Sequence, residues 1–271
     1  MGQDVADPTN PILSPNGVKN GAPMSTLNNT VAVIRCYSNG GIVKQVKALR
    51  SFMSRVVVVT NGLADKGATR AWLEELNDPC VDLIEMNEGY TWSNALNRAL
   101  HHIRMLNAQK DAGIEFVFNV SVEALFRKEH VEQMLAEFAD DNGGVVGTSF
   151  EGYQEGNVIS LGRSYRHPRN TGMIVRLDVF GQPMLGLGFD PFCDDIGGME
   201  DIDFIYRMIV FSGKLTKMLD LRVRLIVGKH HNQNQKEERE RDAMEKIFNR
   251  YQQWSSDLIN SVVTAWRLLA D

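Results

Sequence analysis

Short apolar runs alternate with segments of helical spacing through the first half of the chain, and this alternation restricts the fold more than any other feature. Strands are predicted at 31–34, 56–60, 81–86 and 114–118, with helices between them at 42–53, 68–76 and 92–106. Strands that alternate with helices at this interval form parallel pairs with right-handed crossovers. We therefore expect an α/β fold with a mainly parallel sheet flanked by helices and a ligand site at the carboxyl ends of the strands.

Length and charge limit the size of the fold and its partners. The 271 residues are 43% hydrophobic, which is enough for a sizeable core in one large domain. The net charge of −5 provides no broad positive surface, so no nucleic-acid partner is expected.

The cysteines and the amino-terminal segment indicate the compartment. Cys36, Cys80 and Cys193 lie far apart, in an odd number and without metal-ligand spacing, which favours a reducing, cytoplasmic environment over a disulfide framework. Residues 1–29 contain no continuous apolar run. We expect them to form a flexible amino-terminal arm rather than a signal peptide or membrane anchor, and we expect no transmembrane segment.

Polar and aromatic side chains gather where the predicted strands end. They are Arg35 and Tyr37 after the first strand, Asn61 after the second, Trp92 and Asn97 after the third, and Asn119 and Ser121 after the fourth. Aromatic faces pack on a base, amides hydrogen-bond to its edge or to a ribose, and a cation meets phosphate, so the set suits a nucleotide. The alternative is local: Tyr37 and Trp92 as packing residues, and Asn61 as part of a turn.

Two glycine-rich nucleotide motifs are missing from the sequence. No Gly-x-Gly-x-x-Gly follows the first strand, and Gly-x-x-x-x-Gly-Lys-Ser/Thr does not occur. A nucleotide would therefore be held differently than in dinucleotide-binding or P-loop proteins.

An acidic helix start follows a glycine-rich segment in the second half of the chain. Glu200, Asp201 and Asp203 stand in the first turn of an amphipathic segment that continues to Met208. The helix dipole favours carboxylates at this position, where they can point into a cleft and serve as a catalytic base. The alternative is the ordinary acidic first turn of a surface helix.

An ordered series of motifs resembles the inverting glycosyltransferases of family 2, which have the GT-A fold. The series comprises residues 171–180, the run Leu187-Gly188-Phe189-Asp190, the run Glu200-Asp201-Ile202-Asp203, Arg207, and a strand leading to His230-His231. Residues 89–100 resemble the segment after the third strand of the family, with Ala95 and Asn97 matching and Leu96 standing where many members carry an arginine. The resemblance implies a GT-A domain over residues 30–231.

The resemblance also implies an activity and its partners. It implies transfer of a sugar from a nucleotide-sugar donor to a hydroxyl acceptor, with Asp201 as the acceptor-activating base and Glu200 beside it. An inverting transfer needs such a base, because the acceptor oxygen loses its proton as it attacks the anomeric carbon opposite the leaving diphosphate.

The sequence departs from the family after the fourth strand, where members usually carry Asp-x-Asp and hold a divalent metal. This chain has Asn119-Val120-Ser121. A Mg²⁺ or Mn²⁺ site here would use Ser121, Glu123 and His231, and Glu123 would share the face of Ser121 if the strand continued. Alternatively, protein cations such as Arg35 or Arg163 neutralise the diphosphate, or the protein is a GT-A-like binding module without turnover.

A basic segment and the carboxy-terminal segment complete the interpretation. Arg163 and Arg169 lie in one predicted loop, where they would bind a phosphate or carboxylate of the acceptor; a solvated basic loop is the alternative. Residues 232–271 are expected to form a helical extension, with Trp254, Leu258, Val262 and Trp266 in one apolar stripe. That stripe would pack on the domain or on a second subunit as a homodimer contact.

Overall fold

The computed structural model describes most of the chain between residues 27 and 225. The described residues are 27–37, 41–110, 112–139, 142–151, 157–160, 163–166, 170–181, 188–195 and 199–225, with short pieces at 242–243, 245–247 and 249–250. Most of the expected amino-terminal arm and the whole Trp254 to Trp266 stripe lie outside these residues.

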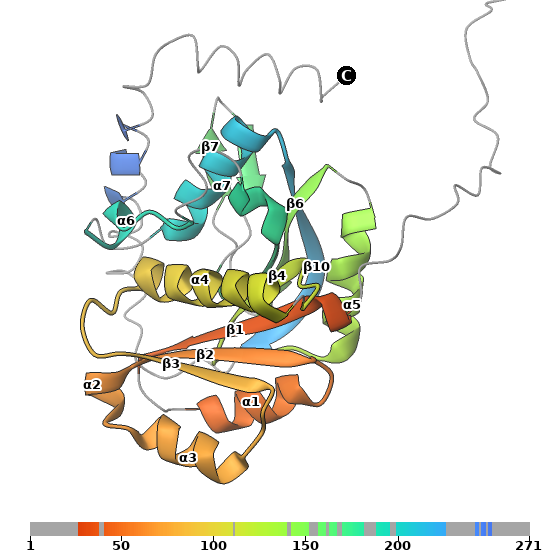
Figure 1. Cartoon of the computed structure of the whole chain (residues 1–271). Helices are drawn as coiled ribbons and strands as arrows, with labels where there is room; N and C mark the ends of the chain where they lie inside the picture. The colour runs from red at the N-terminus through yellow and green to blue at the C-terminus, as the bar shows by residue number, and fades with distance from the viewer. Residues whose placement is uncertain are drawn as a thin grey trace, which may run out of the picture.

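An eight-stranded mixed sheet forms the centre of the molecule (Figure 1). Its strands, in spatial order, are β3 (Val81–Met86), β2 (Arg55–Asn61), β1 (Thr30–Cys36), β4 (Phe116–Ser121), β9 (Gly172–Arg176), β6 (Gly143–Phe150), β10 (Leu215–Leu225) and β5 (Ala124–Leu125). The first four are mutually parallel, as expected for strands joined through helices. Strand β9 runs antiparallel to both β4 and β6, whereas β10 is parallel to β6 and antiparallel to β5.

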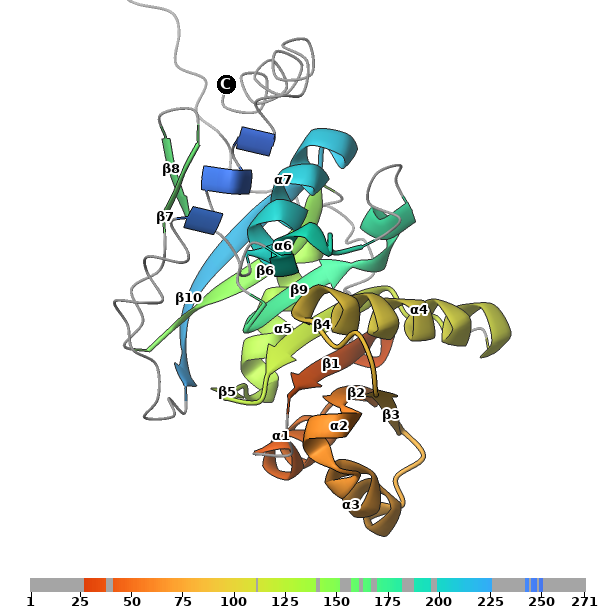
Figure 2. The ribbon, with the colours of Figure 1, turned by 90° about the vertical axis from the view of Figure 1, so that its left-hand side faces the viewer.

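Helices cover both faces of this sheet. They are α1 (Ile42–Arg50), α2 (Gly62–Asp65), α3 (Ala68–Leu76), α4 (Trp92–Lys110), α5 (Lys128–Ala136), α6 (Phe192–Asp195) and α7 (Glu200–Ser212), with 3₁₀ turns η1 (Leu27–Asn29), η2 (Glu137–Ala139) and η3 (Leu177–Gly181). A separate hairpin pairs β7 (Asn157–Ser160) with β8 (Arg163–Arg166). Helices α4 and α7 lie over the same face of the sheet (Figure 2), and their apolar residues belong to one core cluster.

Strand β1 shows why the central strands are continuous apolar runs. Val31 and Val33 belong to the core beneath α4, whereas Ala32 and Ile34 belong to the core on the opposite face. All four side chains are at most 1% exposed. Because successive side chains of a strand point to opposite faces, a strand covered on both sides has no place for a polar residue in its middle.

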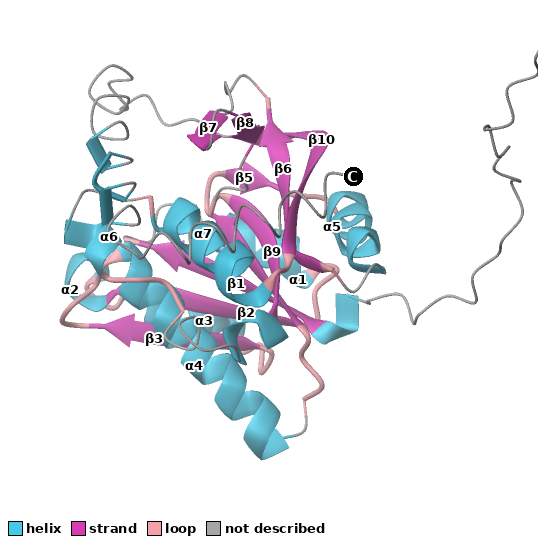
Figure 3. Cartoon of the chain, turned by 90° about the horizontal axis from the view of Figure 1, so that it is seen from above, coloured by secondary structure: helices cyan, strands magenta, loops and turns pink. Residues whose placement is uncertain are grey.

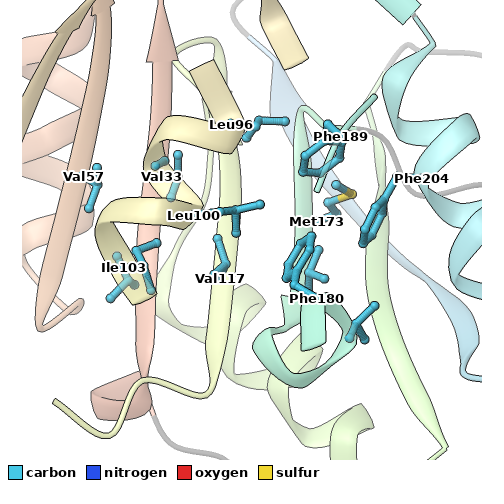
Figure 4. Close-up of a cluster of buried hydrophobic side chains, with 14 of the residues drawn as sticks. Val33, Val57, Leu96, Leu100, Ile103, Val117, Met173, Phe180, Phe189 and Phe204 are labelled. Carbon is cyan, nitrogen blue, oxygen red and sulfur yellow. The ribbon is translucent and has the colours of Figure 1, made fainter. Parts of the chain in front are cut away.

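Three phenylalanines fix α7 to the sheet. Phe204 of α7 stacks on Phe180 of η3 with ring centroids 5.1 Å apart, and it lies 4.8 Å from Phe189. Figure 4 shows these rings beside Met173, next to the α4 side chains. Replacing a fully buried phenylalanine with alanine costs about 3–5 kcal/mol, so this cluster holds the start of α7 firmly.

The structure confirms the predicted fold class, a mixed and mainly parallel sheet flanked by helices. Three details differ from the expectations. Asn119 and Ser121 lie within β4 rather than after it, because the strand pairs with β1 as far as Ser121. The strand does not continue to Glu123, which stands in a turn. The predicted basic loop contains β8, so Arg163 is a strand residue.

No helix among the described residues is both long enough and apolar enough to cross a membrane.

Candidate functional site

A pocket of about 580 Å³ opens at the carboxyl ends of the parallel strands. Figure 3 shows β1 and β3 ending on the side of the sheet where α2 and α6 lie. The pocket is lined by Tyr37, Asn61, Leu63, Ala64, Asn87, Glu88, Gly89 and Tyr90. The described part of the chain has four exposed large apolar residues, and Tyr37, Leu63 and Trp92 among them stand in or beside this pocket. An open pocket with an exposed apolar rim can receive a flat ring.

Aromatic rings lead from this pocket to a buried arginine. The Tyr37 ring meets the Tyr90 ring edge-on at 5.8 Å, and Tyr90 meets Trp92 edge-on at 6.2 Å. The guanidinium of Arg35 lies over Trp92, 4.9 Å from the ring centroid. The Tyr90 hydroxyl is buried and has no hydrogen-bond partner among the described residues, and burial raises the pKa of Tyr90 above its ordinary value. Tyr90 therefore acts as a neutral member of the wall.

Asn61 shapes the pocket as a helix cap. Its Oδ1 accepts a hydrogen bond from the backbone N–H of Ala64 at 3.2 Å, which satisfies a free donor at the start of α2. A Cβ on Gly62 would lie 2.2 Å from Oδ1 of Asn87, so a larger residue there would displace the Asn87 side chain from the pocket wall. Because Oδ1 of Asn61 is used by the helix, its NH₂ group is what remains for a ligand.

Four buried side chains connect β1, β4 and α7 behind the pocket. Asn119 donates through Nδ2 to Oδ1 of Asn170 at 2.7 Å, and Asn170 donates to Oε1 of Glu200, also at 2.7 Å. Arg35 donates through Nη1 to the same Glu200 oxygen and to the carbonyl of Trp92, both at 3.2 Å. The structure thus places Arg35, Asn119 and Glu200 in one network with Asn170, which the sequence analysis did not single out.

Glu200 and Asp201 are adjacent but have different surroundings. Glu200 is 8% exposed, and its burial raises its pKa although Arg35 opposes that change. Asp201 is half-buried and accepts backbone N–H groups of Asn170 at 3.2 Å and Ile202 at 2.9 Å. Among the described residues no cation pairs with Asp201. Within the described part of the chain, Glu200 thus has a cationic partner in Arg35, whereas the partners of Asp201 are backbone N–H groups.

Two further ion pairs fix the loops around α7. Asp203 is fully buried and forms a salt bridge with Arg207 at 2.8 Å, and Arg207 also donates to the carbonyl of Gly188 at 2.9 Å. Asp190 pairs with Arg250 at 2.8 Å. Burial opposes the ionisation of Asp190, but the backbone N–H of Phe192 and Arg250 outweigh it and lower the pKa. These acids stabilise the walls of the site and are not available to a ligand.

Asn97 is not among the residues that line the pocket. Its amide donates to the carbonyl of Phe189 at 2.7 Å and accepts the N–H of the same residue at 2.8 Å. Gly188 has a φ of 75°, and a Cβ there would lie 2.3 Å from Oδ1 of Asn97. Both polar atoms of Asn97 therefore hold the 188–190 loop against α4.

The end of β4 does not provide the ligands that a divalent cation prefers. Asn119 is 2% exposed, and its NH₂ group is committed to Asn170. Ser121 accepts the backbone N–H of Glu123 at 3.2 Å. The described residues contain no group of three or more acidic, histidine or cysteine side chains able to hold a metal. Hard cations such as Mg²⁺ and Mn²⁺ bind best to several converging carboxylates, which these residues do not supply.

The remaining predicted site residues are only partly described. Arg163 lies on β8, in the small hairpin, whereas Arg169 and His231 fall outside the described residues. Asn170 is a site residue that the sequence reasoning did not single out. It stands at the end of the predicted basic segment, and no local pattern distinguishes it from an ordinary turn residue.

The comparison with solved structures supports the fold that this geometry indicates. The chain is similar to the crystal structure of GalNAc-T7 with UDP, GalNAc and Mn²⁺, with a TM-score of 0.54 and 13% sequence identity. The match covers 73% of this chain and 44% of that one. No family model and no curated protein matches the sequence. The fold is therefore GT-A-like, a class whose compared member was crystallised with a nucleotide, a sugar and a metal ion.

Proposed function

We propose that the protein is a glycosyltransferase of the family 2 type, which transfers a sugar from a nucleotide-sugar donor to a hydroxyl acceptor. The proposal rests on one observation: two features of the structure meet at the strand ends. One is the open pocket with its aromatic rim, and the other is the network of Arg35 with the acidic start of α7. The GT-A-like fold, shared with a structure that holds UDP and GalNAc, supports the same class of ligand.

The donor lies across the strand ends in this proposal. Its base occupies the pocket beside Tyr37, where an exposed ring offers a stacking surface and Asn61 a hydrogen-bond donor. Its diphosphate points toward Arg35, next to Trp92. The sugar then lies at the start of α7, beside Asp201.

Asp201 acts as the base in the transfer. The acceptor hydroxyl gives its proton to the Asp201 carboxylate as its oxygen forms a bond to the anomeric carbon. The bond from that carbon to the diphosphate oxygen breaks, and the nucleoside diphosphate leaves with the electron pair. Asp201 suits this role better than Glu200, whose oxygen is occupied by Asn170 and Arg35.

A panel of nucleotide sugars, assayed for transfer and hydrolysis, tests the activity. We expect Asp201→Asn to lower kcat by at least ~100-fold with little change in donor affinity, because only the proton acceptor is lost. Asp195→Asn is the matched control, since it makes the same change on an exposed residue of the neighbouring helix α6. Full turnover by a folded Asp201→Asn variant would remove Asp201 from this role.

The second candidate is a GT-A-like module that binds a nucleotide or a sugar without turnover. The observation that favours it is the end of β4, where Asn119 and Ser121 supply an amide and a hydroxyl in place of carboxylates. Stoichiometric binding of a nucleotide sugar that is never consumed, with or without acceptors, would decide for this candidate.

A further inference from the structure

Most of the acidic side chains around the site are paired with arginines. Three arginine–carboxylate pairs surround the start of α7: Arg35 with Glu200, Arg207 with Asp203, and Arg250 with Asp190. A carboxylate held by a guanidinium is a poor ligand for a second cation, because its charge and its lone pairs are in use. Together with the neutral end of β4, these pairs leave the described site without a set of free carboxylates.

Arg35 keeps hydrogen-bond donors that no other described residue uses. Its contacts within the described residues, to Glu200 and to the Trp92 carbonyl, both come from Nη1. A guanidinium carries five N–H donors in a rigid fork, so Nε and Nη2 retain donors for a ligand. Trp92, on which this fork lies, is 46% exposed and joins the aromatic wall of the pocket.

The geometry of that fork suits a phosphate. Arginine binds phosphate oxygens through two parallel hydrogen bonds, and stacking on an aromatic ring holds the guanidinium in one orientation. A base in the pocket beside Tyr37 would carry its phosphates along the aromatic wall, which ends at Arg35.

We propose that the protein binds the diphosphate of its nucleotide through Arg35 and needs no divalent cation to do so. The inference rests on the proposed function and deepens it, because it names the group that meets the diphosphate. It also separates this chain from the compared structure, which holds Mn²⁺ together with UDP.

Calorimetric titration of the full chain with UDP, GDP, CDP, ADP and dTDP tests the inference. Each titration is done once with a chelator and once with Mn²⁺. We expect at least one nucleoside diphosphate to bind with a Kd that agrees within about twofold between the two conditions. Binding seen only with Mn²⁺ would overturn the inference and leave the proposed function intact. If no nucleoside diphosphate binds in either condition, both the inference and the proposed function are overturned.

Two variants separate the guanidinium of Arg35 from its carboxylate partner. Glu200→Gln removes the carboxylate and should bind the diphosphate at least as tightly as the unaltered protein. Arg35→Gln combined with Glu200→Gln should bind it about tenfold or more weakly, the loss expected for a hydrogen bond to a charged group. Equal Kd values for the two variants would contradict the role of Arg35.

The nucleoside corresponding to the best diphosphate is the control ligand. It lacks phosphates, so its Kd should be the same for both variants. A tenfold loss for the nucleoside as well would assign the effect to the pocket rather than to a phosphate contact, and would also overturn the inference.

Discussion

The two sides of the candidate site are built in opposite ways. The side formed by the ends of β1, β2 and β3 is open, with Tyr37 58% and Leu63 70% exposed at the pocket. The side formed by α7 is closed, with Asp203 and Arg207 buried in an ion pair. A ligand can therefore enter the first side with little rearrangement, whereas the second side presents groups whose positions are fixed before a ligand arrives.

The closed side should depend on its ion pairs for stability. Asp203→Asn leaves Arg207 buried without its carboxylate, and removal of one partner of a buried pair costs about 3–5 kcal/mol. Urea denaturation should show this loss in the free energy of unfolding. A loss below about 0.5 kcal/mol would mean that the two sides do not differ in this way.

Carboxylates placed at the end of β4 should convert the neutral part of the site into a cation site. Asn119→Asp combined with Ser121→Asp adds two acids near Glu200, to which Asn119 is linked through Asn170. Without metal, the buried charge should lower stability by about 1–3 kcal/mol or more. Mn²⁺ should then raise the Tm of this variant and leave that of the unaltered protein unchanged. If Mn²⁺ shifts the Tm of both proteins equally, the conclusion that the end of β4 lacks cation ligands is contradicted.

The open side should tolerate substitution but lose ligand affinity. Tyr37→Ala removes a ring that packs mainly against Tyr90, so the free energy of unfolding should change by only about 0.5 kcal/mol. Nucleotide affinity should fall by about 1–3 kcal/mol if a base stacks there. Tyr37→Phe keeps the ring and serves as the control. Unchanged affinity of Tyr37→Ala would exclude stacking at this position.

The smallest expected effect is a pH dependence from Glu200. Its pKa in the folded protein lies above the ordinary value of 4.5, so the folded state keeps the proton after the unfolded state has released it. The contribution of Glu200 to stability is therefore largest below about pH 4.5 and falls as the pH rises to the folded pKa. Glu200→Gln should remove this slope in a series of denaturation curves. Parallel pH profiles for both proteins would contradict it.

The elements of the open side were predictable because their signals are local. Strand β3 and helix α3 coincide with their predicted spans, since Val81 to Met86 and Ala68 to Leu76 show the pattern within a few residues. One feature of the closed side, the start of α7 at Glu200, was predictable in the same way from its acidic first turn. The pocket residues of the open side follow strand ends, and a parallel sheet brings these ends together at one edge.

The closed side was less predictable because its contacts join distant parts of the sequence. Arg35 and Glu200 are separated by 165 positions, and Asn119 and Asn170 by 51. No periodicity or turn signal identifies such partners, which are determined by the antiparallel insertion of β9 between β4 and β6. Nor does a local pattern identify the two hydrogen bonds between the Asn97 amide and the backbone of Phe189.

The Arg35–Glu200 pair also has a consequence for synthesis on the ribosome. The 165 positions between the two residues correspond to roughly 8–33 seconds of translation at ordinary elongation rates. During that time β1 can pair with β2 and β4. The guanidinium of Arg35 at its end, however, does not yet have the Glu200 carboxylate as an ion-pair partner. In the nascent amino-terminal half, the Arg35 end of β1 must therefore stay in contact with water. It can become buried only when the start of α7 has left the exit tunnel.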